Sequence, residues 1–180
     1  MTNGSRTIPD FDTVVATYDR RLYNLMLRLT GDHHYAQDLT QDVLLIAYRE
    51  YPKFRGESDV FTWLYRIAVN HHRRFLRRMK FKRWLGFSDL ADPEQLAAGD
   101  DPPLVEQDEQ RAAVLAAIAT LPPEYRETVA LFYYEDHDCK RIAAVLGCSE
   151  GTVKSRLWRS RQLLADKLKG FIRETEGSPS

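Results

Sequence analysis

The sequence predicts an all-α protein made of two small helical domains, which are joined by an extended acidic linker. Apolar residues recur at steps of three and four along most of the chain, whereas the alternation typical of strands is weak. Residues 86–108 break this periodicity with prolines, Gly99 and many acids, which indicates an extended segment. The expected order is a flexible N-terminus (1–9), a first domain (10–85), a linker (86–104), a second domain (105–173) and a flexible tail (174–180).

The charges are sorted into blocks, although the 26 Lys and Arg balance the 26 Asp and Glu. Residues 53–84 carry ten bases and two acids, and residues 150–173 carry seven bases and two acids. Residues 89–109, between these blocks, carry eight acids and no Lys or Arg. Two basic surfaces joined by an anionic tether indicate one polyanion held at two places, although charge runs can also be plain solvated faces.

Three helices are predicted in the first domain. The first begins at Asp10 or Asp12 and ends at Thr30-Gly31, since glycine suits the left-handed turn beyond a helix. The second spans about 35–50 and the third about 60–82. The residues expected to face inward are Val15, Tyr18, Leu22, Leu25, Leu29, Leu39, Val43, Ile46, Ala47, Phe61, Leu64, Ala68, Phe75 and Met79.

One side of the third helix carries a basic and aromatic stripe at steps of three and four. This third-helix stripe consists of Trp63, Arg66, Asn70, Arg73 and Arg77. Cations at this spacing can follow a phosphate backbone, and a ring can stack on a base. The preceding loop, 55–59, can form a wall of a pocket for an unstacked base, whose edge an asparagine can hydrogen-bond. The alternative is that Trp63, Phe61 and Tyr65 only flank the core.

The outer face of the second helix has a different character. It consists of Asp38, Gln41, Asp42, Leu45 and Arg49. An acidic patch with an exposed leucine is wrong for DNA and suits a protein partner. A solvated helix face is the alternative.

The second domain ends in a predicted helix-turn-helix. It starts near Leu104, is interrupted at Leu121-Pro122-Pro123, and has a short helix over 139–146. Gly147 permits the sharp turn and Ser149 can cap the next helix. That helix buries Val153, Leu157, Ser160, Leu164 and Leu168, and its opposite face holds Thr152, Ser155, Arg156, Arg159 and Gln162. Such a helix can enter a major groove, although a plain amphipathic helix would show a similar pattern.

Several classes of protein are disfavoured. The polar N-terminus and the lack of an apolar run near ~18 residues argue against a signal peptide or a membrane span. Two cysteines, Cys139 and Cys148, indicate a reducing cytoplasm, with a redox switch as the lesser alternative. The sequence shows no nucleophile beside a base and no glycine-rich phosphate loop, so an enzyme is not expected. It also shows no convincing zinc-ligand spacing, and neither a cofactor nor a metal is expected. His33-His34 is expected in a loop. His71-His72 is expected to contact a nucleic-acid phosphate or to be exposed to solvent.

Taken together, the motifs resemble the bacterial sigma-70 family of RNA polymerase sigma factors. Conserved region 2 is similar to residues 38–43 (DLTQDV), 54–56 (FRG) and 62–70 (TWLYRIAVN) of this chain. Conserved region 4 is similar to residues 121–126 (LPPEYR) and 146–156 (LGCSEGTVKSR). The resemblance covers about residues 10–85 and 105–170, and the length resembles the extracytoplasmic-function (ECF) group. The acids of 135–138 depart from the family pattern and argue against phosphate contact at that corner.

The resemblance implies a promoter-specificity subunit with no catalysis of its own. It would bind the beta and beta-prime subunits of core RNA polymerase, recognise the −35 and −10 elements of promoter DNA and promote melting. The outer face of the second helix would contact polymerase, and the acidic linker would run toward the RNA exit path. An anti-sigma factor is the expected regulator, and no membrane contact is expected. The alternative is a stand-alone helix-turn-helix regulator, usually a dimer.

The resemblance also assigns DNA-contacting residues. Those for the −10 element are Arg55, Gly56, Glu57, Ser58, Asp59, Trp63, Arg66, Asn70, Arg73, Arg74 and Arg77. Those for the −35 element are Ser149, Glu150, Thr152, Lys154, Ser155, Arg156 and Arg159.

Overall fold

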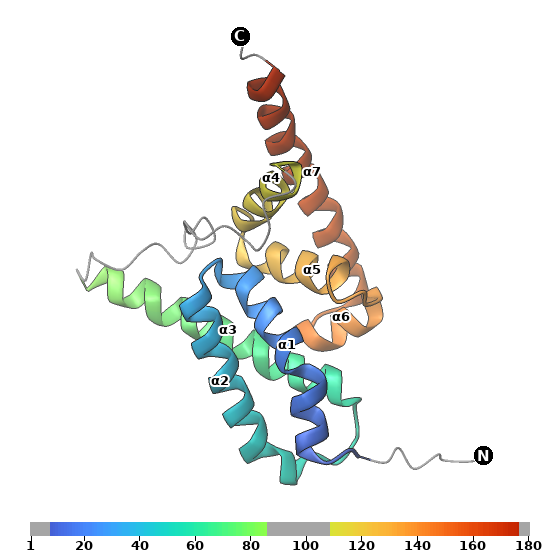
Figure 1. Ribbon diagram of the computed structural model, residues 1–180. Coiled ribbons are helices and arrows are strands. Elements are labelled where there is room, and N and C mark those ends of the chain that lie inside the picture. The colour runs from blue at the N-terminus through green and yellow to red at the C-terminus, as the bar shows by residue number, and fades with distance from the viewer. Residues whose placement is uncertain (1–7, 86–108, 177–180) are drawn as a thin grey trace.

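The structure is a computed structural model that describes the backbone of residues 8–85 and 109–176 and the side chains of residues 8–85 and 114–169. Within these ranges every regular element is helical and none is a strand, which confirms the all-α prediction (Figure 1). The elements are α1 (Phe11–Thr30), α2 (His33–Glu50), η1 (Tyr51–Lys53), α3 (Val60–Trp84), α4 (Glu109–Ala119), α5 (Pro123–Tyr133), α6 (Cys139–Leu146) and α7 (Glu150–Glu176). The predicted acidic linker lies outside the described residues.

Three aspartates start the helices of the first domain. Asp10, Asp32 and Asp59 each accept a backbone N–H from the residue three positions on, at 2.8 Å in every case. The cap at Asp32 corrects one prediction, because it places His33 and His34 in the first turn of α2 rather than in a loop. Asp10 rather than Asp12 caps α1, which selects one of the two predicted starts.

The predicted inward residues of the first domain are mostly buried. At the start of α1 the buried residue is Val14, whereas the predicted Val15 and Tyr18 are only partly buried. The predicted inward face is therefore rotated by one residue at this end of the helix. On α2, Ile46 is also only partly buried. At the far end of the chain α7 continues to Glu176, three residues beyond the predicted end near Arg173.

The second domain builds the predicted helix-turn-helix from α6 and α7. Helix α6 spans the predicted 139–146 and ends at Gly147, which has φ 68°. The Thr152 N–H lies 3.1 Å from Ser149 Oγ, which confirms the predicted cap of α7. Val153, Leu157 and Ser160 are buried as predicted, whereas Leu164 and Leu168 are partly buried.

The two domains pack against one another. In Figure 1, α5 and α6 lie beside α1 and α3, and one cluster of buried apolar residues runs through both domains. This cluster includes Leu64 and Tyr65 from the first domain and Leu131 and Ile142 from the second. The described domains therefore share a hydrophobic core in this structure.

Replacing Gly147 with alanine is expected to lower the free energy of unfolding by about 1 kcal/mol, because an L side chain is strained at φ 68°. An added Cβ would meet no atom within 4 Å, so the cost is one of backbone conformation alone. Urea denaturation measures the change. Gly151→Ala is the control, since its Cβ would lie 3.7 Å from Ser149 Oγ, an ordinary contact, inside a helix that alanine favours. Equal effects of the two changes would contradict the prediction.

Candidate nucleic-acid interface

The third-helix stripe is divided into a free part and a paired part. Asn70 and Arg77 are exposed, as is the neighbouring Arg74. Arg66 donates to the carbonyl oxygen of Ala144 at 2.7 and 3.2 Å. Arg73 forms a two-pronged pair with Glu127 of α5, with the closest N–O distance 2.7 Å. The sequence predicted these side chains on one face, but two of its five residues, Arg66 and Arg73, contact the second domain.

The loop before α3 is held from both domains. Gly56 has φ 71°, the left-handed conformation, and Asp59 caps α3 through the Thr62 N–H. Asp59 Oδ1 also accepts a hydrogen bond from Arg141 of α6 at 3.0 Å. Burial raises the pKa of Asp59, but the hydrogen bonds from Arg141 and Thr62 outweigh burial and lower it below its ordinary value. The carboxylate of Asp59 is therefore held in its charged form.

A small cavity lies between this loop and the N-terminal segment. It has a volume of about 260 Å³ and is lined by Ile8, Pro9, Phe54, Gly56, Ser58, Asp59 and Val60. Trp63 is partly buried nearby, with its ring centre 5.0 Å from that of Phe54 and 5.6 Å from that of Tyr51. Phe61 and Tyr65 are buried in the core, so for these two rings the alternative of a structural role is correct.

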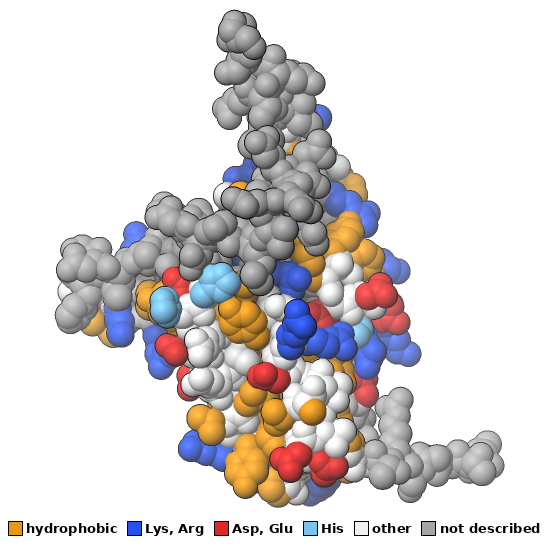
Figure 2. All heavy atoms as spheres, viewed as in Figure 1, with side chains coloured by type: hydrophobic (Ala, Val, Ile, Leu, Met, Phe, Trp, Pro, Cys, Tyr) orange, Lys and Arg blue, Asp and Glu red, His pale blue; other side chains and the backbone are white. Residues whose placement is uncertain are grey.

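Two glutamates of the second domain are buried against the first. Glu127 is 1% exposed, and Glu135 is 6% exposed. Glu135 accepts hydrogen bonds from Tyr65 at 2.7 Å and from Arg21 at 2.9 Å. The predicted exposure of His72 is wrong, because this ring is fully buried and its Nδ1 lies 3.7 Å from Glu127 Oε1. In Figure 2, basic and acidic side chains gather on this face where α1 meets α5 and α6.

His137 makes the domain contact sensitive to acid. Its ring centre lies 3.8 Å from that of Phe61, and its Nδ1 lies 3.4 Å from Arg141. Burial, together with the positive charges of Arg141 and Arg21, lowers the pKa of His137 below its ordinary value of 6.5. Protonation therefore favours the unfolded chain, so the stabilisation by neutral His137 is complete above about pH 6.5 and is lost as the pH falls toward the lowered pKa.

The free energy of unfolding is accordingly expected to fall between pH 7 and pH 5 by more in the wild-type chain than in His137→Asn. Urea denaturation at several pH values measures both slopes. Because His33, His34, His71 and His72 are common to the two chains, the difference between the slopes belongs to His137. Identical slopes would contradict the prediction.

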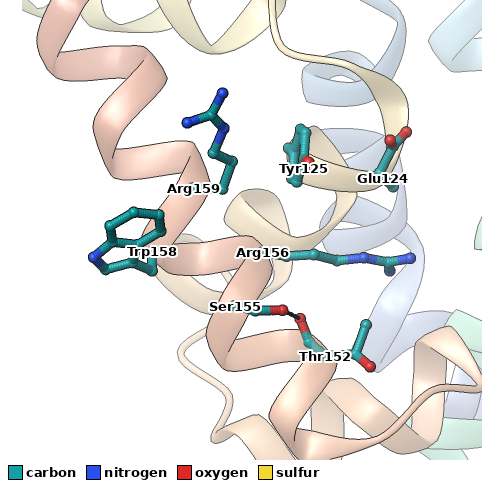
Figure 3. A pocket seen from close by; sticks show the side chains of 7 residues that line it. All are labelled: Glu124, Tyr125, Thr152, Ser155, Arg156, Trp158 and Arg159. Atoms are coloured by element: carbon teal, nitrogen blue, oxygen red, sulfur yellow. Dashed lines mark hydrogen bonds between the residues drawn. The ribbon is translucent and has the colours of Figure 1, made fainter.

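The outward face of α7 is in part open to solvent. Lys154, Ser155 and Arg159 are exposed, while Thr152 and Arg156 are partly buried. Figure 3 shows the side chains lining a hollow of about 470 Å³, with Arg156 extending across it on the side of Glu124. Sequence reasoning missed three of its lining residues, Glu124, Tyr125 and Trp158. Trp158 is 61% exposed and lies three positions after Ser155, so its helical spacing was an available signal.

The outer face of α2 points away from the second domain. All five of its predicted residues are exposed, and Tyr48 beside them is 64% exposed. Figure 2 shows acidic side chains along α2 and hydrophobic side chains at its lower end. Asp42 is 3.0 Å from His71 of α3. This face combines carboxylates with an uncovered apolar patch, the composition expected of a protein-binding surface.

The two cysteines and the remaining titratable side chains were also compared with the requirements of redox and metal sites. Cys139 and Cys148 are free and partly buried. Among residues 8–85 and 109–176 no three His, Cys, Asp or Glu side chains gather as a metal site, and no helix there is long and apolar enough to cross a membrane.

Comparisons with known proteins agree with this geometry. The family profile described as Sigma-70 region 2 matches residues 14–82, and that described as Sigma-70, region 4 matches residues 111–164. The RNA polymerase sigma-H factor of Pseudomonas aeruginosa is 32% identical over 179 residues, which cover 91% of this chain and 89% of that protein. The ECF RNA polymerase sigma-E factor of Escherichia coli is 30% identical over 172 residues, which cover 91% and 88%.

A solved structure matches the whole arrangement. It is the sigma factor RpoE in complex with the anti-sigma factor NepR from Bartonella quintana, with a TM-score of 0.74 and 26% identity over 90% of this chain and 98% of that one. The fold and the helix-turn-helix therefore define a two-domain transcription protein. The chain belongs to the sigma-70 family, as an RNA polymerase sigma factor of the ECF type. The match to region 2 disfavours the stand-alone regulator, because that hypothesis accounts only for the second domain.

Proposed function

We propose that this sigma factor joins core RNA polymerase through the outer face of α2, that is, through Asp38, Gln41, Asp42, Leu45 and Arg49. Carboxylates and an exposed leucine on one helix suit a polymerase surface and not DNA. The partners would be the beta and beta-prime subunits. The chain acts by binding, without a catalytic step of its own, in the cytoplasm where the polymerase works.

The −10 element is proposed to meet the loop 55–59 and the third-helix stripe with Arg74. The cavity beside this loop offers a polar and apolar lining for a base taken out of the stack. Asn70 is exposed on α3 and can hydrogen-bond a base edge. Captured bases would offset the unpairing free energy, which is a few kcal/mol for each base.

The −35 element is proposed to meet the outward face of α7. The predicted contacts are Ser149, Glu150, Thr152, Lys154, Ser155, Arg156 and Arg159, to which the hollow of Figure 3 adds Trp158. An anti-sigma factor is the proposed regulator, because the fold matches along nearly its whole length a sigma factor solved with one. The domain boundaries 10–85 and 105–173 are proposed as the two DNA-contacting units.

The observation that carries this function is that three surfaces of different character lie on separate helices of one chain. The outer face of α2 has the composition of a protein-binding surface, and α3 and α7 each carry a basic face. The test is transcription by core polymerase with the purified protein on a genomic library, followed by sequencing of the transcripts. Starts are expected to share two upstream elements. Starts at random positions would refute the proposal.

Leu45→Asp is expected to weaken binding to core polymerase at least about tenfold, because a charge replaces an apolar contact at the centre of the proposed face. Titration of labelled protein with core polymerase measures the affinity. Leu85→Asp is the matched control, since Leu85 is 51% exposed and Leu45 is 54% exposed. Equal affinities of the two variants would exclude the outer face of α2 as the docking site.

A further inference from the structure

One residue of the outer face of α2 is held by a side chain from another helix. His71 of α3 has its Nε2 atom 3.0 Å from Oδ2 of Asp42. Since an ionised carboxylate only accepts hydrogen bonds, the imidazole donates through its Nε2–H. Within the part of the chain that the structure describes, the polar side chains of Asp38, Gln41 and Arg49 have no such partner. The contact therefore distinguishes Asp42 from the other polar residues of this face.

The two partners differ in their contact with water. The side chain of His71 is 13% exposed, whereas that of Asp42 is 53% exposed. A largely enclosed ring has lost most of its rotational freedom on folding, so His71 offers a donor of fixed position. The other oxygen of Asp42, Oδ1, makes no hydrogen bond within the described residues. The carboxylate is thus anchored through Oδ2, and Oδ1 is available to a donor from a partner.

Docking of core polymerase on this face would remove water from both oxygens of Asp42. A carboxylate oxygen that loses water without gaining a donor raises the free energy of the complex. His71 already supplies the donor to Oδ2, so polymerase has to supply one only to Oδ1. The fixed orientation also reduces the conformational entropy that the side chain loses on binding.

We propose that His71 is a positioning residue of the polymerase-binding face, which acts through the carboxylate of Asp42. The inference rests on the proposed docking role of the outer face of α2. It extends that role to a residue of α3 for which the sequence predicted phosphate contact or exposure. Loss of the donor is expected to weaken core binding about tenfold. The effect on the stability of the fold is expected to be small, because Asp42 is half exposed.

The test uses two amide side chains at position 71 that differ in reach. The amide nitrogen of glutamine is as many bonds from Cα as Nε2 of histidine, while that of asparagine extends only as far as Nδ1. His71→Gln therefore keeps a donor for Asp42 and His71→Asn removes it, although both side chains are neutral and polar. Titration of each labelled full-length variant with core polymerase measures the dissociation constant.

His71→Gln is expected to bind core polymerase within about twofold of the wild-type chain, and His71→Asn about tenfold more weakly. Tyr23→Phe is the control for a loosened first domain and is expected to bind as the wild type does. It removes a hydroxyl that lies 2.6 Å from His33 Nδ1 and joins α1 to α2 away from the outer face. Equal affinities of the two amide variants would overturn the proposal. Urea denaturation compares their stabilities, and His71→Ala replaces His71→Asn should the latter be unfolded.

Removal of Asp42 distinguishes failure of this proposal from failure of the proposed function. Asp42→Ala is expected to weaken core binding at least about tenfold. In that background His71→Asn is expected to cause no further loss, because no carboxylate is left to orient. A further tenfold loss would overturn the positioning role, since His71 would then act without Asp42. Wild-type affinity of Asp42→Ala would instead remove Asp42 from the docking face, and the inference with it.

Discussion

Arg126→Met is expected to lower the free energy of unfolding by about 3 kcal/mol or more, because Arg126 is a buried cation that donates to three main-chain carbonyls. Its side chain is 2% exposed. It donates to Leu29 at the end of α1 at 2.8 Å, to Leu121 at 3.0 Å and to Ala119 at the end of α4. Methionine retains the apolar stem and removes the donors, so these buried carbonyls lose a partner. Urea denaturation followed by circular dichroism measures the change.

Arg28→Met is the control for the loss of an arginine as such. Arg28 lies over the Tyr134 ring with its guanidinium carbon 4.1 Å from the ring centre, a partly exposed contact worth about 1 kcal/mol. Because Arg126 joins α1 to the α4–α5 turn, its loss is expected to weaken both domains in one transition. A loss below about 1 kcal/mol for Arg126→Met would show that water replaces the side chain, which the burial of the site argues against.

The helices were predictable because their signals are local. Asp32, Asp59 and Ser149 act within three residues, and Gly147 acts through its own φ, so a short stretch of sequence contains each boundary. The exception at His33-His34 has the same origin, since the cap of α2 is the aspartate directly before them. Periodicity likewise identified the buried faces to within one residue.

The domain contact was not predictable from such signals. Arg126 and Glu127 are adjacent charged residues near the start of α5, a pattern typical of a solvent-exposed helix start. Their partners Leu29 and Arg73 lie 97 and 54 residues away in the sequence. Charge blocks correctly separated a basic stripe from an acidic α2 face. They could not show that Arg73 of the stripe would pair with Glu127, because pairing across domains depends on how the folded surfaces meet.

Asn70→Ala is expected to lower transcription from a duplex promoter about 5- to 150-fold, which corresponds to the ~1–3 kcal/mol of one two-pronged contact to a base. Asn70 is exposed, so the substitution leaves the fold of α3 intact. Under the proposed function its amide holds a base only after that base has left the duplex. The deficit should therefore lie in strand opening, measured by permanganate reactivity of unpaired thymines and by abortive transcription from the same promoter.

A pre-melted template separates this role from a general loss of activity. With the −10 region already unpaired, Asn70→Ala is expected to recover most of its transcription, because opening no longer depends on capture of the base. Gln37→Ala removes another exposed amide, from α2, and should open the duplex as the wild-type chain does. Affinity for core polymerase should be unchanged in Asn70→Ala, since Asn70 lies on α3 and not on the outer face of α2. An equal deficit on duplex and pre-melted templates would instead place Asn70 in a step after opening and remove it from base capture.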